Sequence, residues 1–173
     1  GIIEGNDTKD LLLKDDYVES VPYVFDGLNK KLSGIRPKEL VLLCAGSGTG
    51  KSQVCRELAF DLINKGNKVG YIALEESVKR SVRGLVSLAV NQPIHIPEVR
   101  KKISDKDLIS AWEKIKDKVC FYDHFGSSDS DDLLNRISFM VQGLNCKYIF
   151  FDHISFVISG ISEGDERRNI DNL

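Results

Sequence analysis

Apolar and polar positions follow one another along the chain in blocks that predict alternating strands and helices. Four short apolar runs are each typical of a buried strand: VLLCA at 41–45, VGYIAL at 69–74, VCFY at 119–122 and KYIFFD at 147–152. Other segments carry apolar residues at helical spacing, at 54–62, 78–89, 108–115 and 131–143. This alternation predicts an α/β fold whose sheet is mainly parallel and flanked by helices.

Composition narrows the class of protein. The 173 residues are enough for one ordinary domain, and 42% hydrophobic with 29% charged residues is typical of a soluble globular chain. No apolar run approaches the roughly 20 residues that span a bilayer, so we expect no membrane segment. A net charge of -2 excludes a protein that covers nucleic acid through an overall positive charge. Any contact with a polynucleotide must then be local. The four cysteines form no CxxC pair, which favours reduced thiols over a zinc site.

Polar residues gather where the predicted strands end. Residues 45–52 follow the first strand, Glu75 and Glu76 follow the second, and Asp152 ends the fourth. Ligands of open α/β sheets bind at the carboxyl ends of the strands. We therefore expect one site to contain all three groups.

The first of these groups, AGSGTGKS at 45–52, fits the phosphate-loop pattern between a strand and a helix. The pattern predicts backbone N–H groups that point at phosphate oxygens, Lys51 at the β and γ phosphates, and the Ser52 hydroxyl on Mg²⁺. The predicted nucleotide-binding residues are Ala45, Gly46, Ser47, Gly48, Thr49, Gly50, Lys51 and Ser52. A merely flexible glycine turn is the alternative interpretation.

The acidic residues predict hydrolysis in addition to binding. Asp152 suits a second carboxylate at the magnesium site, which holds a metal-bound water. Glu75 directly follows its strand and is our choice for the base that deprotonates the attacking water, whereas Glu76 is expected to point away. The alternative is that both glutamates form a solvated helix N-terminus.

Several segments together resemble a known family. FDGLNKKLSGIRPKELVLLCAGSGTGKS, LEES at 74–77, DHIS at 152–155 and SEGDERRNIDNL at 162–173 resemble DnaB-like hexameric replicative helicases of the RecA-like superfamily. The similarity is greatest to the phage T7-type primase-helicases of that family, with the Twinkle helicases less close. The resemblance implies a RecA-like phosphate-loop NTPase core in which Lys51 and Ser52 bind phosphates and Mg²⁺, Glu75 is the catalytic base and Asp152 is the Walker B acid.

The same resemblance implies a domain plan. Residues 1–23 look like a linker from an upstream primase-like domain, and residues 24–173 like a partial helicase ATPase domain that stops after the Walker B strand. The family continues through a phosphate sensor and an arginine finger, neither of which can be assigned to this chain. We therefore expect weak hydrolysis at best from this polypeptide by itself.

The resemblance also implies how the protein works. It predicts a hexameric ring that couples ATP or dTTP hydrolysis to 5′ to 3′ translocation on single-stranded DNA, with a replisome polymerase as a further partner. Residues 157–168 match a loop that faces the central channel, and Arg167 and Arg168 suit contact with a phosphate backbone. An ordinary solvated surface loop is the alternative interpretation of this segment.

Two other functions stay open at this point. One is a RecA-like or KaiC-like ATPase that serves recombination or regulation, and the other is a nucleotide-binding oligomerisation module without catalysis. LEES and DHIS favour the helicase over the first alternative, and a hydrolysis measurement separates it from the second. The expected location is the cytoplasm, of a host cell for a phage protein, or the mitochondrial matrix for a Twinkle-like protein.

Overall fold

The computed structural model describes residues 4–12, 19–123 and 130–152. The chain divides into two compact units, Gly1–Leu40 and Val41–Leu173, and each is described by itself. The predicted domain boundary between residues 23 and 24 stays a prediction.

The first unit contains short helices and one β-bridge. Its elements are η1 (Gly5–Thr8), α1 (Lys9–Leu12) and α2 (Asp26–Leu32). The Asn29 side chain accepts a hydrogen bond from the Tyr23 backbone N–H at 2.7 Å and donates one to the Tyr23 carbonyl at 2.8 Å. Val21 and Ile35 form an antiparallel bridge. These contacts hold α2 against the segment that precedes it.

The second unit is built around a parallel sheet of three strands. The strands are β1 (Val69–Ala73), β2 (Val119–Phe121) and β3 (Tyr148–Asp152), in the order β2-β1-β3. Both pairings are parallel, and Val69 aligns with Val119 on one side and with Tyr148 on the other. Every residue of β1 is buried, as expected of the central strand of a covered parallel sheet. The predicted α/β class with a parallel sheet is confirmed.

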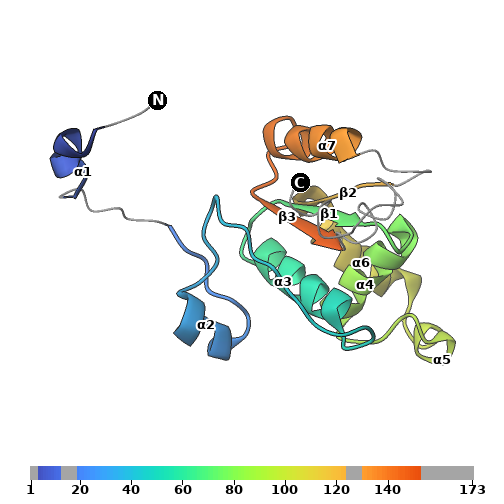
Figure 1. The fold of residues 1–173 in the computed structure, drawn as a ribbon. Coiled ribbons are helices and arrows are strands. Elements are labelled where there is room, and N and C mark those ends of the chain that lie inside the picture. The colour runs from blue at the N-terminus through green and yellow to red at the C-terminus, as the bar shows by residue number, and fades with distance from the viewer. Residues whose placement is uncertain (1–3, 13–18, 124–129, 153–173) are drawn as a thin grey trace. The chain divides into compact units, whose positions relative to one another are not determined.

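Helices cover both faces of this sheet. The helical elements of this unit are α3 (Lys51–Asn64), α4 (Val78–Val90), α5 (Pro97–Arg100), α6 (Asp105–Glu113), the 3-10 turn η2 (Lys116–Lys118) and α7 (Ser130–Gln142). In Figure 1, α7 lies on one face of the sheet and α3, α4 and α6 lie on the opposite side. The Ser104 hydroxyl accepts a hydrogen bond from the Asp107 N–H at 3.1 Å and caps α6.

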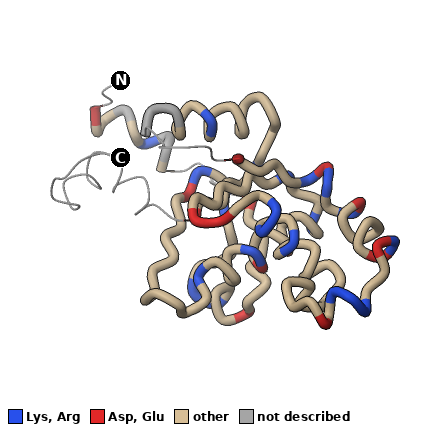
Figure 2. The backbone as a smooth tube through the Cα atoms, turned by 90° about the vertical axis from the view of Figure 1, so that its right-hand side faces the viewer, with Lys and Arg blue, Asp and Glu red and all other residues tan. Residues whose placement is uncertain are grey.

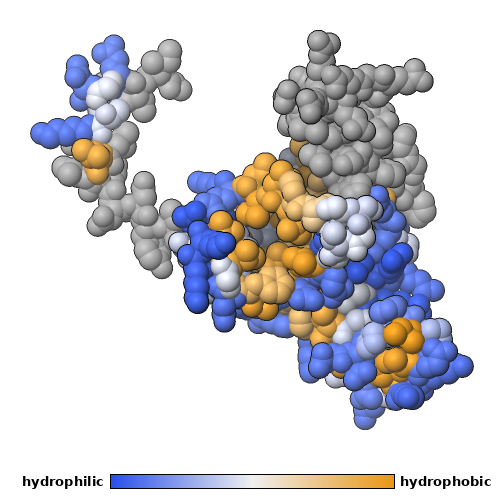
Figure 3. All heavy atoms as spheres, turned by 60° about the horizontal axis from the view of Figure 1, so that its bottom comes forward, coloured by the Kyte–Doolittle hydropathy of each residue, from blue (hydrophilic) through white to orange (hydrophobic). Residues whose placement is uncertain are grey.

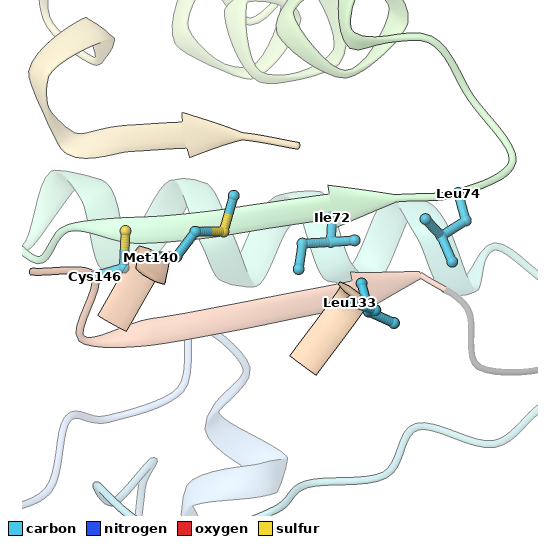
Figure 4. Close-up of a cluster of buried hydrophobic side chains, with 5 residues drawn as sticks. All are labelled: Ile72, Leu74, Leu133, Met140 and Cys146. Carbon is cyan, nitrogen blue, oxygen red and sulfur yellow. The ribbon is translucent and has the colours of Figure 1, made fainter. Parts of the chain in front are cut away.

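Apolar side chains fill the space between α7 and the sheet. Figure 4 shows this cluster, in which α7 and the turn before β3 meet the central strand. Its buried members are Ile72, Leu74, Leu133, Met140 and Cys146. Leu133 and Ile137 of the predicted apolar face of α7 pack in this cluster. Leu134 and Val141 of the same predicted face are 49% and 45% exposed, so only part of that face meets the sheet.

Residues 41–45 do not form a strand, so the prediction for this segment is wrong. The backbone has no regular secondary structure there, and the Leu42 side chain is 72% exposed. An apolar run forms a strand only where a neighbouring strand pairs with its backbone, and no described residue provides that pairing. Figure 3 shows apolar side chains that reach the surface on one face of the molecule.

Charged residues of both signs occur along the tube drawn in Figure 2. Lys and Arg positions are interspersed with Asp and Glu positions in that view rather than gathered on one side. Among the described helices, none has both the length and the apolar character needed to cross a bilayer.

Candidate nucleotide-binding site

The glycine-rich loop turns directly into α3. Gly48 and Gly50 have φ angles of 74° and 95°, in the left-handed region that glycine adopts without strain. The Thr49 hydroxyl donates a hydrogen bond to the Gly46 carbonyl at 2.7 Å and closes the turn. Gly50 is the N-cap of α3, and no side chain caps the helix. The first N–H groups of α3 are thus suited to bind an anion.

Lys51 lies over the same loop. Its Nζ donates hydrogen bonds to the carbonyl oxygens of Ala45 at 2.8 Å and Gly46 at 3.0 Å. An ammonium group has three N–H donors, so one donor stays available for a ligand oxygen. The lysine is therefore held against the loop by its own backbone carbonyls.

Strand pairing brings the two acidic strand ends together. Ala73 aligns with Asp152, and the Leu74 N–H donates a hydrogen bond to the Asp152 carbonyl at 2.8 Å. Glu75, the next residue, is exposed, and the Asp152 side chain is half-buried. Both carboxylates therefore lie at the same edge of the sheet.

One hollow joins the loop to these strand ends. It has a volume of about 420 Å³. Its walls contain Ser47, Gly48, Gly50, Lys51, Ser52, Gln53, Arg56, Ala73, Glu75, Glu76, Arg80 and Asp152. The structure thus brings together Lys51, Ser52, Glu75 and Asp152, which the sequence predicts as one site although they come from three segments.

Glu76 differs from Glu75 in its surroundings. Its side chain is 9% exposed and binds the Arg56 guanidinium, and it accepts a hydrogen bond from the Ser81 hydroxyl at 2.7 Å. Arg80 is a second, more exposed basic neighbour, with 3.4 Å between its Nε and a Glu76 oxygen. We expected Glu76 to point away from the site, but it lies in the wall of the hollow, where its oxygens are engaged by neighbouring side chains.

The pKa of the Cys55 thiol depends on charged groups beside the hollow. Burial, followed by the negative charge of Asp152, raises the pKa of the Cys55 thiol to about 11, and Arg56 acts in the opposite direction. The thiol is therefore neutral at physiological pH. Its interaction with Asp152 indicates that the first turns of α3 pack near the end of β3.

Sequence reasoning missed Arg56 and its contacts. The arginine is four positions beyond Ser52 on the same helix, so helical spacing places these two side chains on one face. Its pairing with Glu76 joins segments 20 positions apart, for which the sequence carries no motif. The predicted channel-facing residues Arg167 and Arg168, and the segment 157–168, lie outside the described residues.

Comparisons with known proteins identify the family of this chain. The family described as DnaB-like helicase C terminal domain matches residues 20–172. The DNA helicase/primase of Enterobacteria phage T3 is 35% identical over 165 residues, covering 90% of this chain and 29% of the phage protein. The chain thus spans less than a third of that relative.

A solved structure of a KaiC-like protein from Pyrococcus horikoshii OT3 shares the fold. The similarity has a TM-score of 0.63 at 20% sequence identity, and it covers 90% of this chain and 62% of the other. At this identity the likeness concerns the fold alone. Because the family match covers most of the sequence, the chain belongs to the DnaB-like helicase C-terminal domain family.

Proposed function

We propose that this chain binds a nucleoside triphosphate in the hollow and is the hydrolytic part of a replicative DNA helicase. The observation that carries the proposal is that the glycine-rich loop, Glu75 and Asp152 line the same hollow. The loop binds the phosphates through the backbone of residues 45–52, and the free donor of Lys51 binds the β and γ phosphates.

Ser52 and Asp152 are the residues that hold Mg²⁺. Both line the hollow, and hydroxyl and carboxylate oxygens are ligands that this hard cation prefers. Phosphate oxygens and water would complete the coordination of such a cation. When bound, Mg²⁺ neutralises phosphate charge that develops during transfer.

Glu75 is the base for hydrolysis. Its carboxylate takes a proton from a water molecule while the water oxygen attacks the γ-phosphorus. The bond between the γ-phosphorus and the bridging oxygen breaks, and the products are a nucleoside diphosphate and inorganic phosphate. Lys51 stabilises the charge on the phosphate oxygens. Glu76 instead binds Arg56 and Ser81 in the wall of the hollow.

Movement along DNA is supported by family membership and by the phage relative. We propose a hexameric ring that uses ATP or dTTP to translocate 5′ to 3′ on single-stranded DNA, with Arg167 and Arg168 at the phosphate backbone. A replisome polymerase is the further partner. The phage relative favours the cytoplasm of a bacterial host over the mitochondrial matrix as the place of action.

A RecA-like or KaiC-like regulatory ATPase is the less favoured alternative. The KaiC-like structure supports it only through the shared fold. The non-catalytic module differs in its prediction, because it binds nucleotide and does not cleave it.

Nucleotide binding by the chain tests the first step. A fluorescent nucleoside triphosphate is titrated with and without Mg²⁺ against the native chain, Lys51→Ala and Lys65→Ala. Lys65 is the matched control because it pairs with Asp61 at the other end of the same helix. We expect Lys51→Ala to weaken binding at least about 10-fold, since a charge-assisted bond contributes up to about 3 kcal/mol. Equal affinities of all three proteins would contradict the proposal.

A further inference from the structure

Arg56 connects two parts of the hollow that are separate in the sequence. It lies on α3, close after Lys51 and Ser52, and its guanidinium binds the carboxylate of Glu76. Glu76 follows Glu75 in the segment between β1 and α4. The ion pair therefore ties the helix that begins at the phosphate loop to the segment that carries the proposed base.

The pair is well enclosed. The side chains of Arg56 and Glu76 are 13% and 9% exposed. Glu76 also accepts a hydrogen bond from the buried Ser81 hydroxyl at 2.7 Å, whereas the Arg56 Nε is buried and has no hydrogen-bond partner among the described residues. A buried charge that loses its partner is strongly unfavourable, so each side chain restricts the position of the other.

The fold makes room for Arg56 at Gly84. A Cβ at this position would lie 2.7 Å from both the Cδ and the Nε of Arg56. Gly84 is in the interior of α4, where glycine is less favourable than alanine for helix stability. The close approach of the arginine explains why a helix of this length carries a glycine there.

We propose that Arg56 is a positioning residue: through Glu76 it fixes the segment that presents Glu75 to the γ-phosphate. The proposal rests on the proposed function of Glu75 as the base. A base must lie within hydrogen-bond reach of the attacking water, so a small displacement of the segment reduces turnover more than nucleotide binding. Arg56 itself does not contact the reacting atoms.

Steady-state hydrolysis of the nucleoside triphosphate is measured with the longest polypeptide that includes this chain. The variants are Arg56→Gln, the doubly neutral Arg56→Gln with Glu76→Gln, and Arg56→Lys. The double variant keeps the net charge of the hollow but removes the ion pair. Because the segment that carries Glu75 is then less fixed, we expect kcat to fall at least about 10-fold while KM changes less than about threefold. Arg56→Lys retains the charge and is expected to recover part of the lost kcat. Arg100→Gln is the matched control, because Arg100 pairs with Asp105 outside the hollow.

A second experiment tests the geometry without hydrolysis. Gly84→Ala is made in the native chain and in an Arg56→Ala background, and the thermal unfolding midpoint is measured. We expect the added methyl group to lower the midpoint only when the arginine is present. An equal effect in both backgrounds would overturn the role assigned to Gly84.

The outcomes separate the two proposals. In one outcome the native protein hydrolyses nucleotide, Glu75→Gln abolishes turnover, and the double variant has the same kcat as Arg100→Gln. The positioning role of Arg56 is then wrong, and the proposed function stands. If the native protein binds but never cleaves nucleotide, the proposed function fails, and so does the positioning role that rests on it. A fall in kcat with unchanged KM, partly restored by Arg56→Lys, supports the proposal.

Discussion

The backbone N–H of Leu74 donates a hydrogen bond to the carbonyl oxygen of Asp152 at a distance of 2.8 Å, and this bond joins the ends of two parallel strands. Glu75 follows Leu74 directly, so this bond sets the proposed base beside the proposed Mg²⁺ ligand. The glycine-rich loop lies across the same hollow. The proposed chemistry depends on this meeting of three segments.

Replacing Asp152 with Asn tests its role toward Mg²⁺. The amide keeps the size of the side chain but removes the charge that attracts the cation. We expect the Mg²⁺ concentration needed for half-maximal nucleotide binding to rise at least about 10-fold, which corresponds to about 1.4 kcal/mol. Titration of Mg²⁺ at a fixed concentration of labelled nucleotide measures this shift. An unchanged requirement would exclude Asp152 as a ligand.

Alkylation of Cys55 tests how close α3 lies to Asp152. Burial and then the Asp152 charge raise the thiol pKa to about 11, so alkylation by iodoacetamide is expected to be slow at pH 8 and to accelerate as the pH rises toward that value. Asp152→Asn removes one of the causes of the raised pKa. The thiol pKa is then expected to fall, and the alkylation rate at pH 9 to 10 to increase because more of the thiol is ionised. The exposed Cys44 serves as the internal control. Identical rate profiles for Cys55 in both proteins would contradict the effect of the Asp152 charge on this thiol.

Alkaline conditions are expected to destabilise the fold through the half-buried thiol of Cys55 and the buried thiol of Cys146. Burial is the first cause that raises the pKa of both Cys55 and Cys146 to about 11, from an ordinary value of 9.0. A raised folded-state pKa gives stability that is complete below the unfolded-state value and is lost as the pH rises through the folded-state value. Urea unfolding between pH 8 and 11 should thus show a smaller loss for Cys55→Ala than for the native chain. A parallel loss in both would refute this cause.

Neutralising Arg167 and Arg168 tests the proposed contact with DNA. Each phosphate contact on a single strand contributes about 0.7 to the slope of log affinity against log salt concentration. The double variant to Gln is therefore expected to bind more weakly and with a slope about 1.4 shallower. Binding to labelled single-stranded DNA at several salt concentrations, in the longest form of the protein, measures both quantities. Unchanged affinity and slope would support an ordinary surface loop.

The sequence predicted most of the sheet and helices because their signals are local. The apolar run that ends in Asp152 is a strand, and the helical spacing at 108–115 falls largely on α6, as their patterns indicate. The apolar run at 41–45 carries the same signal but forms no strand, because pairing depends on a neighbour that a local pattern does not reveal. A local pattern thus indicates which segments could form a strand. It does not indicate which of those segments pair with a neighbouring strand.

The candidate site divides in the same way. The glycine-rich loop follows from the spacing of its own residues, and Glu75 follows from the end of its strand. The pairing of Arg56 with Glu76 and the recess at Gly84 arise from the packing of α3 against α4, between residues distant in the sequence. Such contacts become visible only when the helices are placed in space.

Single-turnover hydrolysis by Glu75→Gln tests the central claim most directly. Radiolabelled ATP or dTTP is bound with Mg²⁺ to the native protein and to the variant, in the longest form that contains the chain, and the released phosphate is followed. The glutamine keeps the size of the side chain but cannot take a proton, so we predict unchanged nucleotide affinity and a cleavage rate lowered at least about 100-fold. Cleavage by the variant at the native rate would contradict the assignment of Glu75 as the base of this site.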